Sequence, residues 1–200
     1  ADQVPSALGR KTGDFIGVNY YTKAYIVWKN IGDTAPHPEF VPMQLENSKE
    51  KASTSLLPFS VSLMKKTESA SDMGWAIHPK GLGRMLRFVK AYGLPIYITE
   101  NGIADASDEK RAGYLKSHLL EVAQAIAEGN DIRGYYYWSL LDNFEWIKGF
   151  GPRFGLVHVD YDNFRRKVRT SAELYGRVIE AHQKAHLRPT KSLIEKAFPL

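Results

Sequence analysis

Pro95-Ile-Tyr-Ile-Thr-Glu-Asn-Gly102 is the segment from which the architecture of this chain can be worked out. Ile96–Thr99 is an apolar run of β-prone residues that is too short for a helix, which indicates a buried strand. Asn101-Gly102 is a turn signal, so the strand is expected to finish with Glu100 at its carboxyl end. Catalytic side chains collect at that end of the strands in parallel α/β folds. Glu100 is therefore the first candidate for catalysis.

On both sides of this segment, expected strands and helices alternate. Runs of β-branched and aromatic residues indicate the strands, and apolar residues at helical spacing indicate the helices. The order is strand, helix, strand, helix, strand, helix, at 15–21, 79–92, 96–99, 114–126, 133–141 and 171–185, with a short additional strand at 156–159. This order predicts three parallel βα units. A (β/α)8 TIM barrel needs eight units and about 250 residues. We therefore expect residues 1–200 to form one α/β domain that is part of a barrel.

Residues 22–78 separate the first expected strand from the first expected helix. They contain no long periodic segment, and Pro36, Pro38, Pro42 and Pro58 interrupt them. A loop of this length inside a compact domain is usually functional or mobile. We expect a long loop that contributes no strand to the barrel.

The composition bounds the class of protein. Hydrophobic residues make up 44% and charged residues 24%, which is typical of a soluble globular body. The net charge is +5, and the chain from Asn163 onward contributes +6, with nine Lys or Arg against three Glu. Such a cluster can bind nucleic acid or an anionic membrane, but a solvated last helix explains it, and we expect neither partner.

The absence of cysteine excludes disulfides and thiolate metal sites. It suits a cytoplasmic protein without excluding a secreted one. Ala1–Lys11 has no apolar core of the signal-peptide type, and no run approaches membrane-spanning length. Since the chain does not begin with Met, a removed leader or a missing upstream part stays possible.

Four motifs in order carry a family resemblance. They are Asp14-Phe-Ile-Gly-Val-Asn-Tyr-Tyr21, Ile98-Thr-Glu-Asn-Gly102, Gly134-Tyr-Tyr-Tyr-Trp-Ser-Leu-Leu-Asp-Asn-Phe-Glu-Trp146 and Arg153-Phe-Gly155. Together they resemble family 1 glycoside hydrolases, the retaining β-glucosidases and β-galactosidases. The resemblance covers nearly the whole chain and implies that the three units are the sixth to eighth of the barrel. It also implies that residues 22–78 form one wall of the substrate cleft.

The resemblance implies a role for each candidate residue. Glu100 is the nucleophile, and Tyr21 donates its hydroxyl to Glu100. The implied sugar ligands are Asn19, the Trp138 platform, Glu145 and Trp146 for the distal hydroxyls, and Phe154, which closes the pocket. An indole face packs well on a pyranose, and a carboxylate accepts hydroxyl donors. Each aromatic residue taken alone is as readily explained as part of the core.

Glu145 bears on the substrate. Relatives that prefer 6-phosphorylated sugars replace this acidic residue and add a phosphate-binding Ser and Lys. A carboxylate would repel a phosphate, so non-phosphorylated β-D-glycosides are expected. No cofactor is implied. His182 and His186 are four residues apart on the last helix, but no third ligand is evident, and no metal is expected.

One required group is missing from the sequence. Retention needs a second carboxyl group as acid/base, and in the family it lies in an Asn-Glu-Pro motif that this chain lacks. Three accounts stay open: a portion of a β-glucosidase completed by an N-terminal barrel portion, a sugar-binding module without catalysis, or a structural remnant. Self-association is the other way to cover the open strand edges.

Overall fold

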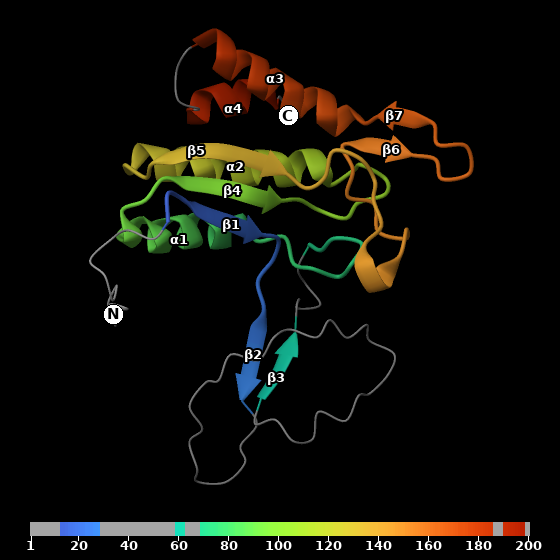
Figure 1. Cartoon of the computed structure of the whole chain (residues 1–200), viewed down its shortest axis with the longest axis horizontal. Helices are drawn as coiled ribbons and strands as arrows, with labels where there is room; N and C mark the ends of the chain where they lie inside the picture. The colour runs from blue at the N-terminus through green and yellow to red at the C-terminus, as the bar shows by residue number, and fades with distance from the viewer. Residues whose placement is uncertain (1–12, 29–58, 63–68, 186–189, 199–200) are drawn as a thin grey trace.

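A parallel three-stranded sheet is the centre of the structure. The computed structural model describes residues 13–28, 59–62, 69–185 and 190–198. The strands are β1 (Ile16–Tyr20), β4 (Ile96–Asn101) and β5 (Ile132–Tyr137), in the spatial order β1-β4-β5. Both pairings are parallel. The sheet therefore has the three parallel strands that the sequence predicts, and all their carboxyl ends lie at one edge (Figure 1).

Two helices connect these strands and cover one face of the sheet (Figure 1). Helix α1 (Pro79–Val89) begins with a proline in its first turn, and a 3-10 turn (Lys90–Tyr92) extends it. Gly93 follows with φ +64°, the left-handed conformation that ends helices. Helix α2 (Arg111–Ala127) joins β4 to β5. Both helices were expected, and their apolar stripes point to the sheet.

The main core lies between the sheet and these helices. Its buried members include Leu82 and Leu86 of α1, Ile96 and Ile98 of β4, and Val122 of α2. A second cluster joins α2 to α3 (Thr170–Ala185) and α4 (Lys191–Ala197) through Leu119, Val178, Ile194 and Phe198. The strand residues thus face the helices in alternation, as expected for a barrel wall.

The structure contains elements that the sequence did not indicate. Antiparallel strands β2 (Tyr25–Trp28) and β3 (Phe59–Ser62) lie within the expected loop, away from the three-stranded sheet (Figure 1). The short strand at 156–159 is β6 (Val157–Val159), and it pairs antiparallel with β7 (Arg166–Val168). Helix α4 was also missed. The predictions for Ala1–Lys11 and His186 concern residues outside those that the structure describes.

Two boundaries differ from the expectation. Strand β4 continues through Asn101, so the Asn101-Gly102 dipeptide is not a turn immediately after Glu100. Strand β5 ends at Tyr137 rather than near Leu141. From Ser139 the chain pairs instead with 154–157, through Ser139 N–H to Phe154 O and Leu156 N–H to Ser139 O. The peptide bond between Trp138 and Ser139 is cis.

The other face of the sheet is open. Phe15 and Tyr136 on it are 55% and 58% exposed. Gly17 and Gly134 lie on the same face, where an added Cβ would come within 3.2 Å of Thr99 and 2.6 Å of Tyr97. In a closed barrel this face is the packed interior. No helix in the described part of the chain has both the length and the apolar character needed to cross a membrane.

Candidate active site

The carboxyl ends of β1 and β4 bring Tyr21 and Glu100 together. Tyr21 follows the last residue of β1, and its hydroxyl donates a 2.6 Å hydrogen bond to Glu100 Oε2. Burial raises the pKa of Tyr21 most, and the hydrogen bond and negative charge of Glu100 raise it further. The phenol therefore stays protonated at neutral pH, so it acts as a donor. A charged acceptor makes such a hydrogen bond strong.

Two aromatic side chains pack against the ring of Tyr21. Trp75 and Phe154 meet it edge to face, with ring centroids at 5.7 and 6.2 Å. Phe154 is only 1% exposed, so it forms the packed base of this cluster. Its expected contact with a bound sugar stays a prediction. Trp75 is not among the residues predicted for the site, and the structure adds it through its ring contact with Tyr21.

Asn19 lies beside Glu100 at the open face of the sheet. It is the register partner of Glu100 in the β1–β4 pairing. Its Oδ1 accepts a 2.6 Å hydrogen bond from the Thr99 hydroxyl. The expected contact of Asn19 with a sugar stays a prediction.

Trp138 follows β5 and is tied to the strand that carries Glu100. Its N–H donates to Asn101 O at 3.0 Å. Its own carbonyl oxygen lies so close to Gly102 that an added Cβ there would be 1.8 Å away. Glycine at 102 is therefore needed for the close approach of the two strand ends. This contact fixes the backbone of Trp138 relative to Glu100.

Glu145 lies on the loop after β5, where its pKa is affected by the charge of Glu100. Burial raises the pKa of Glu145, a hydrogen bond from Asn143 opposes that shift, and the charge of Glu100 adds to it. Oε2 of Glu145 is buried and has no hydrogen-bond partner among the groups that the structure describes. Trp146 is 79% exposed and starts a 3-10 turn (Trp146–Lys148) with φ +47°. Its expected contact with a sugar stays a prediction.

Buried charges hold the loops around these residues, and no pattern in the sequence indicated them. Asp142, whose side chain is fully buried, pairs with Arg169 at 3.1 Å and Arg153 at 3.4 Å. It also accepts from the N–H groups of Gly155 and Val159. These bonds anchor the β5 loop, which carries Glu145, to the β6–β7 hairpin.

A second buried cation ties the β4 loop to the same region. Arg111 is fully buried at the start of α2 and pairs with Asp108. It also donates to Tyr137, to the carbonyl of Asp105 and to the carbonyl of Arg153. Arginine is usually found at the surface, so the residue type alone does not predict that Arg111 is buried. Its burial becomes evident only from its partners in the folded chain.

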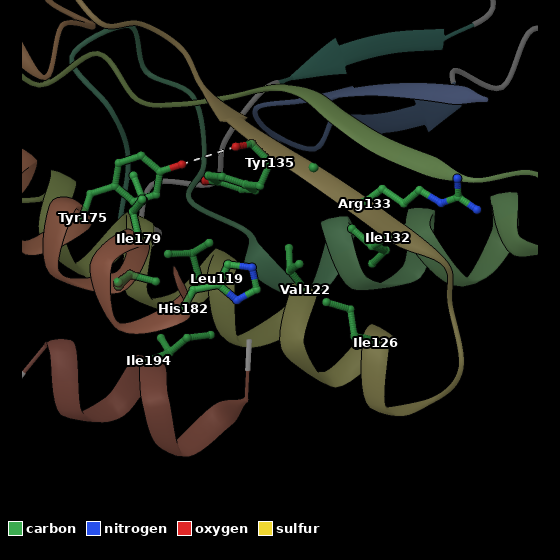
Figure 2. Close-up of a pocket in the computed structure, with 12 residues that line it drawn as sticks. Leu119, Val122, Ile126, Ile132, Arg133, Tyr135, Tyr175, Ile179, His182 and Ile194 are labelled. Atoms are coloured by element: carbon green, nitrogen blue, oxygen red, sulfur yellow. Dashed lines mark hydrogen bonds between the residues drawn. The ribbon is translucent and has the colours of Figure 1, made fainter. Parts of the chain in front are cut away.

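The one cavity described lies elsewhere. It measures about 380 Å³ and lies between β5, α2, α3 and α4, lined by Leu119, Tyr135, Tyr175 and Ile194 among others (Figure 2). No candidate site residue lines it. Within the described ranges, no three His, Cys, Asp or Glu side chains are grouped so that they could hold a metal ion.

A parallel sheet with helices on one face, and a carboxylate hydrogen-bonded to a tyrosine at its carboxyl edge, are the features that the resemblance to a barrel glycoside hydrolase implies. Comparison of the sequence with known families identifies which one. The chain belongs to glycosyl hydrolase family 1, whose family model matches residues 2–184.

Individual relatives agree with this assignment. A beta-galactosidase from Sulfolobus acidocaldarius is 41% identical over 170 residues, which cover 84% of this chain and 32% of the relative. Beta-glucosidase A from Acetivibrio thermocellus is 36% identical over 178 residues, covering 84% and 35%. A solved beta-glycosidase from Pyrococcus horikoshii superposes with TM-score 0.68 at 40% identity, covering 94% and 38%. The chain thus spans about a third of the length of these curated relatives.

Proposed function

We propose that this chain supplies the nucleophile and half of the sugar site of a retaining β-glycosidase. The proposed substrates are non-phosphorylated β-D-glycosides of the β-glucosidase type. The 2.6 Å hydrogen bond from Tyr21 to Glu100 carries the proposal, because a phenol that stays protonated holds the carboxylate in a fixed orientation at the carboxyl edge of the sheet. The printed names of the relatives, beta-galactosidase and beta-glucosidase, support the reaction class.

In the proposed mechanism, a Glu100 oxygen attacks the anomeric carbon as the bond to the leaving oxygen breaks. A glycosyl ester on Glu100 forms, and a second carboxyl group about 5 Å away protonates the leaving oxygen. That group then takes a proton from water, whose oxygen attacks the anomeric carbon and frees Glu100. The sugar keeps its β configuration. Tyr21 stays neutral throughout and aims the carboxylate.

The sugar is proposed to rest on Trp138 and to donate its distal hydroxyls to Glu145. The unpartnered and buried Oε2 of Glu145 supports this, since such an oxygen gains from a hydroxyl donor. Trp146 and Asn19 are proposed to complete the contacts, with Phe154 holding the cluster from below. The negative charge of Glu145 favours sugars without a 6-phosphate.

The second carboxyl group is proposed to come from a complementary N-terminal barrel portion. An open sheet face, with Phe15 and Tyr136 exposed, supports the need for a covering partner. The cavity lined by β5, α2, α3 and α4 supports it too, because it lies beside β5, which is an edge strand of the three-stranded sheet (Figure 2). Residues 1–200 would join that portion as one partial-barrel domain. The absence of cysteine favours the cytoplasm as its place of action.

Reconstitution tests the proposal. The chain would be mixed with the amino-terminal portion of the Sulfolobus acidocaldarius beta-galactosidase that precedes the matched region. We expect a one-to-one complex by intact mass and release of p-nitrophenol from its β-D-glucoside. The Glu100→Gln variant should form the complex without hydrolysis, whereas Tyr92→Phe, on the exposed end of the 3-10 turn, should be as active as wild type. An active Glu100→Gln complex would rule out the assigned nucleophile.

A sugar-binding module is the second candidate, and the missing acid/base group favours it. Glucose binding to the chain without turnover, abolished by Trp138→Ala, would support binding as the function. A homo-oligomer with neither property would instead identify a structural remnant.

A further inference from the structure

Strand β4 changes its alternation at Glu100. Ile96 and Ile98 are fully buried against the helices, while Thr99 lies on the open face with Asn19. Regular alternation would send Glu100 toward the helices and Asn101 to the open face. The observed arrangement is the reverse, since Glu100 bonds to Tyr21 and Asn101 is 0% exposed.

Both neighbouring pairings are irregular at this level. The register shifts between Val18 and Asn19 on one side of β4, and between Ile98 and Asn101 on the other. A bulge of this kind leaves two successive side chains on one face and redirects those that follow. Thr99 and Glu100 are those two residues. The bulge therefore turns the carboxylate away from the helix layer.

Asn101 makes the contacts that the irregular ladder lacks. Its Nδ2 donates to Tyr20 O at 2.6 Å and to the Tyr114 hydroxyl at 2.8 Å. Its Oδ1 accepts from the Tyr135 hydroxyl at 2.7 Å, and its main-chain oxygen accepts from Trp138 N–H. One residue thus binds the ends of β1, β5 and α2.

We propose that Asn101 is the positioning residue that keeps the bulge at Thr99–Glu100 and so holds Glu100 against Tyr21. Any effect of Asn101 on catalysis rests on the proposed function, whereas its effect on the position of Glu100 does not. Because the Tyr20 carbonyl can only accept a hydrogen bond, the group at 101 must offer a donor. Aspartate offers none when ionised, and leucine leaves the Tyr20 carbonyl and the Tyr135 hydroxyl buried without this partner. Relaxation to regular alternation would move Glu100 toward the helices.

The test follows the Tyr21–Glu100 hydrogen bond in the full 200-residue chain. Tyrosine is labelled with ¹³C at the ring carbon that bears the hydroxyl, and Tyr21→Phe identifies the Tyr21 signal. Glu100→Gln gives the position of this signal without the carboxylate. Asn101→Leu should move the signal from the wild-type position to that of Glu100→Gln. Tyr135→Phe removes one partner of Asn101, and it should move the signal part of the way.

Asn130→Leu is the matched control. Asn130 is also a buried asparagine, and its amide bonds to Ala125 O at 2.7 Å at the opposite end of the sheet. This variant should lose stability without moving the Tyr21 signal. A Tyr21 signal that stays at the wild-type position in Asn101→Leu overturns the proposal, as does an equal shift in Asn130→Leu. If Asn101→Leu does not fold, Tyr135→Phe provides the test: a partial shift of the Tyr21 signal supports the proposal, and an unmoved signal overturns it. None of these readings needs hydrolysis, so a chain without glycosidase activity would leave the geometric test intact.

Discussion

The hydroxyl of Tyr21 lies 2.6 Å from Oε2 of Glu100, although 79 residues separate them in the sequence. Adjacent parallel strands bring the two together, because Tyr21 follows β1 and Glu100 lies at the end of β4. A phenol kept protonated by burial and by the carboxylate itself can orient that carboxylate without taking its charge.

Replacing Tyr21 with phenylalanine should slow hydrolysis in the reconstituted complex. A hydrogen bond to a charged group contributes about 1.5–3 kcal/mol, which corresponds to roughly 10- to 100-fold in kcat. KM should change less, since the ring and its contacts with Trp75 and Phe154 remain. Steady-state kinetics with p-nitrophenyl β-D-glucoside measures this, with Tyr92→Phe as control. An unchanged kcat would remove Tyr21 from the mechanism.

Replacing Glu145 with glutamine should weaken sugar recognition and relax discrimination against phosphate. The loss of a charged acceptor lowers kcat/KM for the glucoside by roughly 10- to 100-fold. The ratio of kcat/KM between the glucoside and its 6-phosphate should narrow, because the repulsive charge is gone. The matched control is Asp162→Asn in the exposed β6–β7 turn. An unchanged ratio would mean that Glu145 does not face the 6-position.

Local signals in the sequence were sufficient for the helix boundaries near Pro79 and Gly93, because these residues act through their own backbone geometry. Strand β4, which carries Glu100, was also readable from its composition. The prediction of a turn at Asn101-Gly102 was wrong, although this dipeptide often forms turns. In this chain, the Asn101 side chain bonds to the end of β1, and Gly102 permits the close approach of Trp138. Tertiary partners decide between these uses, and they are far away in the sequence.

Buried charges were the other part that the sequence did not indicate. Asp142 and Arg111 look like surface residues by composition, and only the folded chain shows their several partners. Trp75 lies near the end of the long loop in the sequence, and its ring contact with Tyr21 in the structure makes it part of the site. The candidate residues themselves came from the ordered motifs, whereas the groups that hold them came from the structure.

Acid should destabilise the chain through His118. Burial lowers the pKa of this histidine to about 4, although Nδ1 contacts Tyr114 O. The unfolded chain therefore binds more protons between about pH 6.5 and 4, so stability is full above this window and falls as the pH drops through it. From pH 7 to 5 the contribution is about 2 kcal/mol. Urea unfolding at both pH values measures it.

The variant His118→Leu isolates that contribution. Its free energy of unfolding should depend less on pH between 7 and 5 than that of wild type, whatever its absolute stability. His182→Gln, at an exposed position of α3, should keep the wild-type dependence. Equal pH dependence in wild type and His118→Leu would show that other groups cause the acid sensitivity.

Two glycine-to-alanine changes should have opposite effects. At Gly102 the new Cβ would lie 1.8 Å from Trp138 O, so the strand ends must separate. We expect a loss of at least about 2 kcal/mol in stability, as for other overpacked sites. At Gly113, within α2, nothing lies within 4 Å, and alanine should stabilise the helix by about 0.5–1 kcal/mol. Urea unfolding compares the two, and a neutral Gly102→Ala would refute the close contact.

Neutralising Asp142 should destabilise the chain far more than neutralising an exposed carboxylate. Asp142→Asn leaves Arg169, which is nearly buried, without its charged partner, and removing one member of a buried pair costs about 3–5 kcal/mol. The control is Asp131→Asn, whose pair with Arg133 is about half exposed and should contribute less than about 1 kcal/mol. Chemical denaturation gives both values.

The Asp142 bonds also hold the loop that carries Glu145, so kcat/KM of the reconstituted complex should fall with stability in Asp142→Asn and stay constant in Asp131→Asn. Similar losses of stability in the two variants would mean that solvent screens Asp142 as well. That result would contradict the description of Asp142 as a buried, paired carboxylate.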